Sequence, residues 1–99
     1  MKLEITADNF ELTEALKSFV VSKFAKIERH ISRLSHVNGV HVVLSLGKNL
    51  QKAEIFLHLP KADVCASSET PSMYNSIVDV IKKIDRQMLK HKQKMNNHG

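Results

Sequence analysis

The sequence predicts an α+β fold in which two amphipathic helices cover one face of a four-stranded sheet, in the order β-α-β-β-β-α. Apolar residues alternate with polar ones in four short segments, as in strands with one buried face. In two long segments they recur every three or four residues, as in helices. A strand–helix–strand crossover makes its strands parallel and short turns make neighbours antiparallel, so a two-layer sandwich results.

The first strand and helix occupy the N-terminal third. Residues 2–7 alternate as a half-buried strand does, and Thr13 can cap a following helix because its hydroxyl accepts hydrogen bonds from the free amides of the first turn. The helix is expected to run to about Leu34, before Asn38-Gly39. Its buried stripe consists of Leu16, Phe19, Val20, Phe24, Ile27, Ile31 and Leu34.

Three strands are predicted next, over Val40–Leu46, Gln51–Leu59 and Ala62–Ser68. Glycine, asparagine and proline residues between them supply the turns. The last strand is expected to be shorter and weaker, with Val64 and Ala66 facing inward. By alternation, the outer face of the sheet carries His41, Val43, Phe56, His58 and Cys65.

The last helix is predicted from Ser72 to Lys94, with Met95–Gly99 fraying. Its buried stripe would contain Tyr74, Ile77, Val78, Ile81, Ile84 and Met88, and its opposite side Lys82, Lys83, Arg86, Lys90 and Lys94. Between Lys82 and Lys94 there are six basic residues against one acid, Asp85, a local balance of +5 that equals the net charge of the whole chain.

The first helix has its own basic edge, which includes Lys23, Lys26, Arg29, His30 and Arg33. Helices placed side by side would bring this edge toward the basic side of the last helix, giving one electropositive surface. Clustered like charges add along a surface, so a polyanion is the expected partner. The alternative is a solvated helix face kept basic for solubility.

The chain of 99 residues is expected to form a single domain over 1–95, with 96–99 as a frayed tail. It has neither an apolar run long enough to span a membrane nor the apolar block of a secretory signal. Its one cysteine, Cys65, cannot close an internal disulfide. We therefore expect a cytoplasmic monomer without membrane association.

Catalysis and metal binding have little support in the sequence. No CxxC, HExxH or phosphate-loop pattern is present, so no metal and no cofactor are expected. His41, His58 and Cys65 could meet as a nucleophile with its base, but such residues are also common on a solvated sheet face. Val43 and Phe56 on that face could mark a protein contact. We expect a binding protein and not an enzyme.

Three stretches resemble a known family: ITADNFELTEAL, KFAKIERH and MYNSIVDVIKKIDRQMLKHKQK. They are similar to the short ribosome hibernation promoting factors, also described as sigma-factor modulation or ribosome-associated inhibitor proteins. The resemblance spans nearly the whole chain. One departure is Ser72, where family members commonly have Asp, although Ser can cap the helix equally.

The resemblance implies a fold similar to double-stranded RNA-binding domains and a role on the small (30S) ribosomal subunit during stationary phase or starvation. Family members occupy the channel of messenger RNA and the A- and P-site transfer RNAs, and short members help a separate modulation factor to join ribosomes into inactive 100S dimers. Two other functions stay open: a generic RNA or DNA binder, and a modulator that contacts a sigma factor through the outer sheet face. Positions that match the family's 16S rRNA contacts are Lys23, Lys26, Arg29, Lys83, Arg86 and Lys90; the helical period alone adds Lys82, Lys92 and Lys94.

Overall fold

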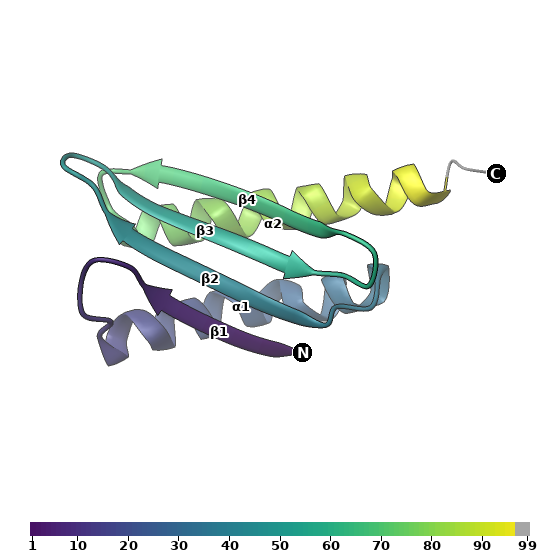
Figure 1. Cartoon of the computed structure of the whole chain (residues 1–99), viewed down its shortest axis with the longest axis horizontal. Coiled ribbons are helices and arrows are strands. Elements are labelled where there is room, and N and C mark those ends of the chain that lie inside the picture. The colour runs from purple at the N-terminus through teal and green to yellow at the C-terminus, as the bar shows by residue number, and fades with distance from the viewer. Residues whose placement is uncertain (97–99) are drawn as a thin grey trace.

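The computed structural model describes residues 1–96 and has the predicted order of elements. Four strands form one sheet and both helices lie behind it on the same face (Figure 1). The elements are β1 (Lys2–Ala7), α1 (Glu14–Leu34), β2 (Gly39–Leu46), β3 (Gln51–His58), β4 (Asp63–Thr70) and α2 (Met73–Asn96). The predicted α+β sandwich is therefore confirmed.

The sheet order is β1-β2-β3-β4, with β1 parallel to β2 and the other neighbours antiparallel. The parallel pair follows from the crossover through α1, and the antiparallel pairs follow from short turns. β2 and β4 run in the same direction. Because α1 leads into β2 and α2 follows β4, the two helices lie side by side and run in the same direction as each other (Figure 1). Both basic helix faces thus belong to one layer of the molecule.

Both helices begin at the predicted caps. The Thr13 hydroxyl accepts a hydrogen bond from the Leu16 amide at 3.1 Å. At α2 the Ser72 hydroxyl accepts one from the Asn75 amide at 3.4 Å, so Ser72 caps this helix as expected. α1 ends at Leu34, as predicted.

The core lies between the sheet and the helices and contains Val20, Phe24, Ile31, Val40, Val42, Leu44, Ala53, Ile55, Leu57, Ile77, Val80, Ile81, Ile84 and Met88. The predicted buried stripe of α2 was wrong at Tyr74, which is 44% exposed. Val78 was also predicted to be buried and is half-buried. Tyr74 instead packs edge-to-face on Phe19 of α1, with ring centroids 4.7 Å apart. The neighbouring helix, and not the sheet, is its partner.

Ser76 is fully buried in that stripe although it is polar. Its hydroxyl donates to the Gln51 carbonyl at 2.7 Å and accepts from the Thr70 amide at 3.0 Å. These bonds fasten the start of α2 to the ends of β3 and β4 and satisfy the buried hydroxyl.

β4 and α2 each end two residues later than predicted, whereas the other predicted ends of the strands differ by at most one residue. β4 is eight residues long and continues to Thr70, because Gln51 and Lys52 of β3 extend far enough to pair with Thr70 and Glu69. α2 continues to Asn96 instead of ending at Lys94, so the first part of the expected frayed tail is helical. Residues 97–99 lie outside the described part of the chain. Within residues 1–96, no helix is both long and apolar enough to cross a lipid bilayer.

Candidate nucleic-acid interface

The α1 part of the interface centres on Lys23 and Lys26. The Lys23 ammonium lies 5.3 Å from the centre of the Phe19 ring, a cation–π distance that directs it along the side of α1 next to α2. The nearby charge of Lys26 lowers the pKa of Lys23, so the two ammonium groups are close enough to repel one another. An anion bound between them would relieve that repulsion.

Arg29 lies three residues after Lys26 and is exposed. At this spacing it continues the basic edge by one further turn, on the solvent side of α1. A guanidinium there can bind one phosphate with two parallel hydrogen bonds. The three α1 residues expected from the family pattern therefore lie on adjacent turns of a single helix face.

The α2 part surrounds a shallow recess between α2 and β4. Lys83, Arg86 and Lys90 line it together with Ala66, Ser67 and Gln87, and it holds about 360 Å³. Lys83 donates to the Ser67 carbonyl at 3.1 Å and lies 3.5 Å from the Asp79 carboxylate, so β4 and α2 both hold its position. The recess presents three cations to a ligand of phosphate size.

Lys94 continues the same side of α2. A second recess of about 300 Å³ is lined by Lys90 and Lys94 with His91 and, on β4, Asp63 and Cys65. Lys90 lines both recesses, which makes it the link between them. The α2 cations thus form a row that faces the free edge of β4.

Two of the predicted residues lie elsewhere. Lys82 is exposed and precedes Asp85 by three residues, so it lies nearer to α1 than the Lys83 row does. Lys92 is half-buried and follows Met88 and Asp85 on their side of the helix. The expected single surface is therefore arranged as an α1 group and a row beside β4. Lys82 and Lys92 belong to neither group and lie one turn before and two turns after Asp85 on α2.

Asp79 is a residue of the site that the sequence pattern did not indicate. Its carboxylate accepts a hydrogen bond of 2.5 Å from the Ser68 hydroxyl, which lies on β4 and is 3% exposed. That hydrogen bond is the largest cause of a lowered pKa for Asp79, and the charges of Lys83 and Arg86 lower it further. Asp79 is consequently an anion that holds Lys83 toward the recess.

A lowered pKa for Asp79 predicts an acid-dependent loss of stability. The contribution is complete at pH values above the ordinary Asp range, near 4, and is lost as the pH falls through the lower pKa of the folded state. Ser68→Ala should cost about 1 kcal/mol at pH 7. This cost should shrink in thermal melts of both proteins as the pH falls below the ordinary Asp range. An equal cost at every pH would mean that the hydroxyl acts only through packing.

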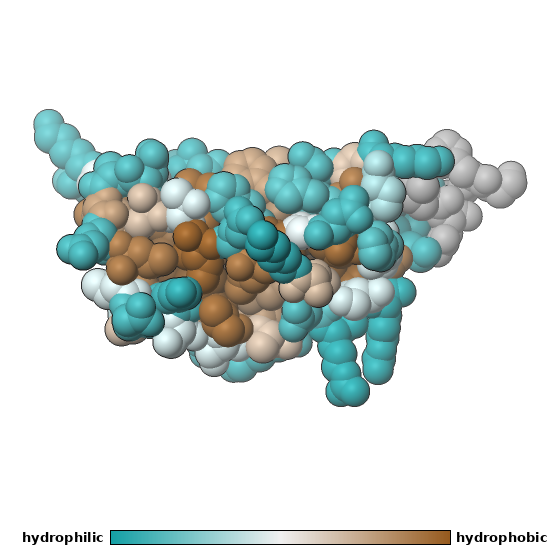
Figure 2. All heavy atoms as spheres, turned by 60° about the horizontal axis from the view of Figure 1, so that its bottom comes forward, coloured by the Kyte–Doolittle hydropathy of each residue, from teal (hydrophilic) through white to brown (hydrophobic). Residues whose placement is uncertain are grey.

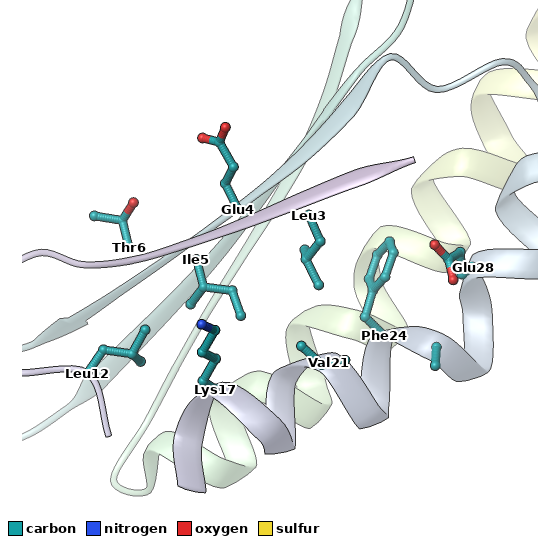
Figure 3. A pocket seen from close by; sticks show the side chains of 10 residues that line it. Leu3, Glu4, Ile5, Thr6, Leu12, Lys17, Val21, Phe24 and Glu28 are labelled. Carbon is teal, nitrogen blue, oxygen red and sulfur yellow. The ribbon is translucent and has the colours of Figure 1, made fainter. Parts of the chain in front are cut away.

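A groove of about 560 Å³ lies on the other side, between β1 and α1. Figure 2 looks onto that side and shows hydrophobic residues gathered there among hydrophilic ones. Leu3, Ile5 and Phe24 point into the groove, whereas the Glu4 side chain points away from α1 (Figure 3). Lys17 and Glu28 line it from α1 with opposite charges, so the groove does not favour a polyanion and is not assigned to the interface.

The outer face of the sheet offers separate polar pairs and no converging site. The Thr6 hydroxyl is 2.8 Å from the His41 ring nitrogen, and His58 is 3.2 Å from Asp63. Cys65 is exposed and lies opposite Phe56 in the β3–β4 ladder. Among the described residues, no group of three His, Cys, Asp or Glu side chains is placed to hold a metal ion.

Fold and site together define a small α+β domain whose helical layer presents a basic surface. The family model for "Sigma 54 modulation protein / S30EA ribosomal protein" matches residues 3–96, and the chain belongs to this family. A protein named "Ribosome hibernation promoting factor" from Escherichia coli (strain K12) is 42% identical over 98 residues, which cover 99% of this chain and 100% of that protein. A protein of the same name from Azotobacter vinelandii is 36% identical over 94 residues, 95% of this chain and 85% of that protein.

Two solved structures have the same fold. The crystal structure of the Thermus thermophilus Protein Y N-terminal domain has a TM-score of 0.75 at 26% identity and covers 92% of this chain and 99% of that one. A ribosomal subunit interface protein from Coxiella burnetii has a TM-score of 0.83 at 20% identity, covering 94% and 99%. The latter likeness concerns the fold alone.

Proposed function

We propose that this protein is a ribosome hibernation factor that binds the small ribosomal subunit through 16S rRNA. In this proposal it occupies the channel of messenger RNA and the A- and P-site transfer RNAs, and so inhibits translation in stationary phase or under stress. The names of relatives that match over their full length support a hibernation role. The observation that carries the rRNA contact is the recess of Lys83, Arg86 and Lys90, because three cations held beside a strand edge suit a phosphate backbone.

The same proposal gives its partners and its place in the cell. The protein acts as a monomer in the cytoplasm, where ribosomes are, and uses binding instead of catalysis. In this proposal a separate ribosome modulation factor completes the inactive 100S dimer.

Sedimentation of extracts from starved cells tests the proposal. The tagged protein should travel with small subunits and 100S dimers, and cells that lack it should form fewer dimers. Recovery only in fractions free of ribosomes, under conditions that do produce dimers, would contradict the proposal.

A second candidate function follows from the family description, which includes sigma-54 modulation. The outer sheet face carries Phe56 and Val43, both half-buried, so a protein partner could contact apolar groups there. Co-purification of RNA polymerase with a sigma factor, abolished by Phe56→Lys and unaffected by loss of the α2 cations, would favour this candidate over ribosome binding.

Binding to the ribosome is expected to weaken steeply with salt. Phosphate contacts release condensed counterions, so the logarithm of affinity should fall linearly with the logarithm of salt concentration. Titrations of purified small subunits between 50 and 200 mM salt, roughly the range over which several phosphate contacts lose orders of magnitude, measure the slope. A nearly constant affinity would indicate apolar or protein-mediated docking.

A further inference from the structure

One ion pair joins the two helices of the basic layer. The Nδ1 atom of His30 on α1 lies 2.6 Å from Oδ1 of Asp85 on α2. The side chains are 47% and 31% exposed, so the pair is in contact with solvent. Among the ion pairs of the described residues, this is the one that bridges α1 and α2.

The pair works together with a second contact between the helices. Phe19 meets Tyr74 edge-to-face, and these two residues have the same separation along the chain as His30 and Asp85. α1 and α2 therefore run in parallel with a constant register, and they contact each other at two points about three turns apart. The aromatic contact holds their N-terminal halves, and the ion pair holds the halves that carry most of the cations.

Asp85 is the one acid among the cations from Lys82 to Lys94. Lys26 and Arg33 lie one turn to either side of His30 on α1, and on α2 Lys82 lies one turn before Asp85 and Lys92 two turns after it. The sheet contributes no charge here, because its inward residues are Val40, Val42, Leu44, Ala53, Ile55 and Leu57. A bare carboxylate at this point would repel phosphates that approach the surrounding cations.

We propose that His30 masks the negative charge of Asp85 on the basic surface when its imidazole is protonated. This inference rests on the proposed function, since the ligand is the phosphate backbone of rRNA. A protonated His30 makes the pair neutral, whereas a neutral His30 leaves one negative charge on the basic surface. Phosphate binding favours the protonated pair, so rRNA binding takes up a proton.

The expected consequence is pH-dependent affinity. Histidine side chains change charge between about pH 5 and 8. Lowering the pH from 8 to 6 should tighten binding about threefold to tenfold at constant salt, the effect of one nearby unit charge in water. The chain has six histidines, so the effect of His30 must be isolated with variants.

Affinity for purified small subunits at pH 6 and pH 8 tests the inference with three proteins. The parent should bind several-fold more tightly at pH 6. His30→Gln should lose most of this gain and bind at pH 6 as the parent does at pH 8. Asp85→Asn, which removes the charge to be masked, should bind at pH 8 as tightly as the parent does at pH 6. Thermal melts establish whether each variant is folded. If His30→Gln does not fold, the affinity of Asp85→Asn at pH 8 decides whether the inference holds.

Retention on heparin in the same buffers separates this inference from the proposed function, since heparin is a polyanion without ribosomal structure. Equal pH effects for parent, His30→Gln and Asp85→Asn would overturn the inference while leaving ribosome binding in place. Failure to bind subunits at either pH would overturn the proposed function instead. In that case, a pH-dependent shift in heparin elution that requires His30 would support the masking of Asp85 by His30. The absence of this shift would overturn the inference together with the proposed function.

Discussion

Replacing Lys83, Arg86 and Lys90 together by Ala is expected to weaken binding to the small subunit about 100-fold, at roughly 1 kcal/mol or somewhat more for each lost charged contact. All three side chains line one recess, so their removal empties it of positive charge. The fold should persist, since surface substitutions usually cost within about 0.5 kcal/mol each. Titration with purified subunits and thermal melts of the same preparations measure both effects.

A matched control removes the same charge elsewhere. Lys2, Lys17 and Lys48 are exposed at the start of β1, on the β1 side of α1 and in the turn after β2, away from both basic groups. Changing these three to Ala should reduce affinity only a few-fold, through the weaker long-range field. Equal losses in the two triple variants would mean that net charge alone drives binding. Unchanged binding by the first variant would mean that the α2 row is only a solvated helix face.

The salt dependence should separate the two variants in a second way. Each phosphate contact that is lost lowers the slope of the logarithmic salt plot by about one. The Lys83, Arg86 and Lys90 variant should therefore have a visibly flatter plot than the parent. The control variant should keep the slope of the parent.

The fold could be predicted from the sequence because the spacing of apolar residues within each helix and strand is a local property. Alternation in the strands and three-to-four spacing in the helices depend only on which face is buried, and every predicted element is present. Thr13 and Ser72 act as caps through bonds within one helical turn, which the sequence places directly. The crossover rule then fixed the sheet order without any knowledge of side-chain contacts.

Errors arose where a residue's partner comes from another element. Helical spacing placed Tyr74 in the core, but α1 lies beside it and receives its ring. Ser76 was absent from the predicted stripe because its partners are backbone groups of β3 and β4. The bonds from Ser68 to Asp79 and from His30 to Asp85 likewise join distant segments, and no spacing within the sequence indicates them.

For the basic residues too, the sequence predicts local grouping, whereas contacts with other elements are visible only in the structure. Helical period grouped Lys83, Arg86 and Lys90 correctly on one side of α2, and the structure adds the β4 backbone that holds Lys83. Lys92 was added to the predicted site from the helical period, and in the structure it lies on the side of α2 that carries Asp85. The sequence shows that the cations are clustered, whereas the packing of the two helices determines which of them lie close together.

Ile84→Ala is expected to lower the free energy of unfolding by about 2–5 kcal/mol, because the side chain is fully buried between α2 and the sheet and its loss leaves a cavity. In a domain of this size the melting temperature should fall by roughly 10–30 °C. Leu89→Ala is the matched control on the same helix: it removes an equal volume from a side chain that is 42% exposed, and should cost much less. At a temperature where circular dichroism finds Ile84→Ala folded, its affinity for small subunits should equal that of the parent, since every cation of α2 is unchanged. Weakened binding by the folded variant would mean that the buried and basic faces of α2 are not independent, and that precise seating of the helix on the sheet is itself required for recognition.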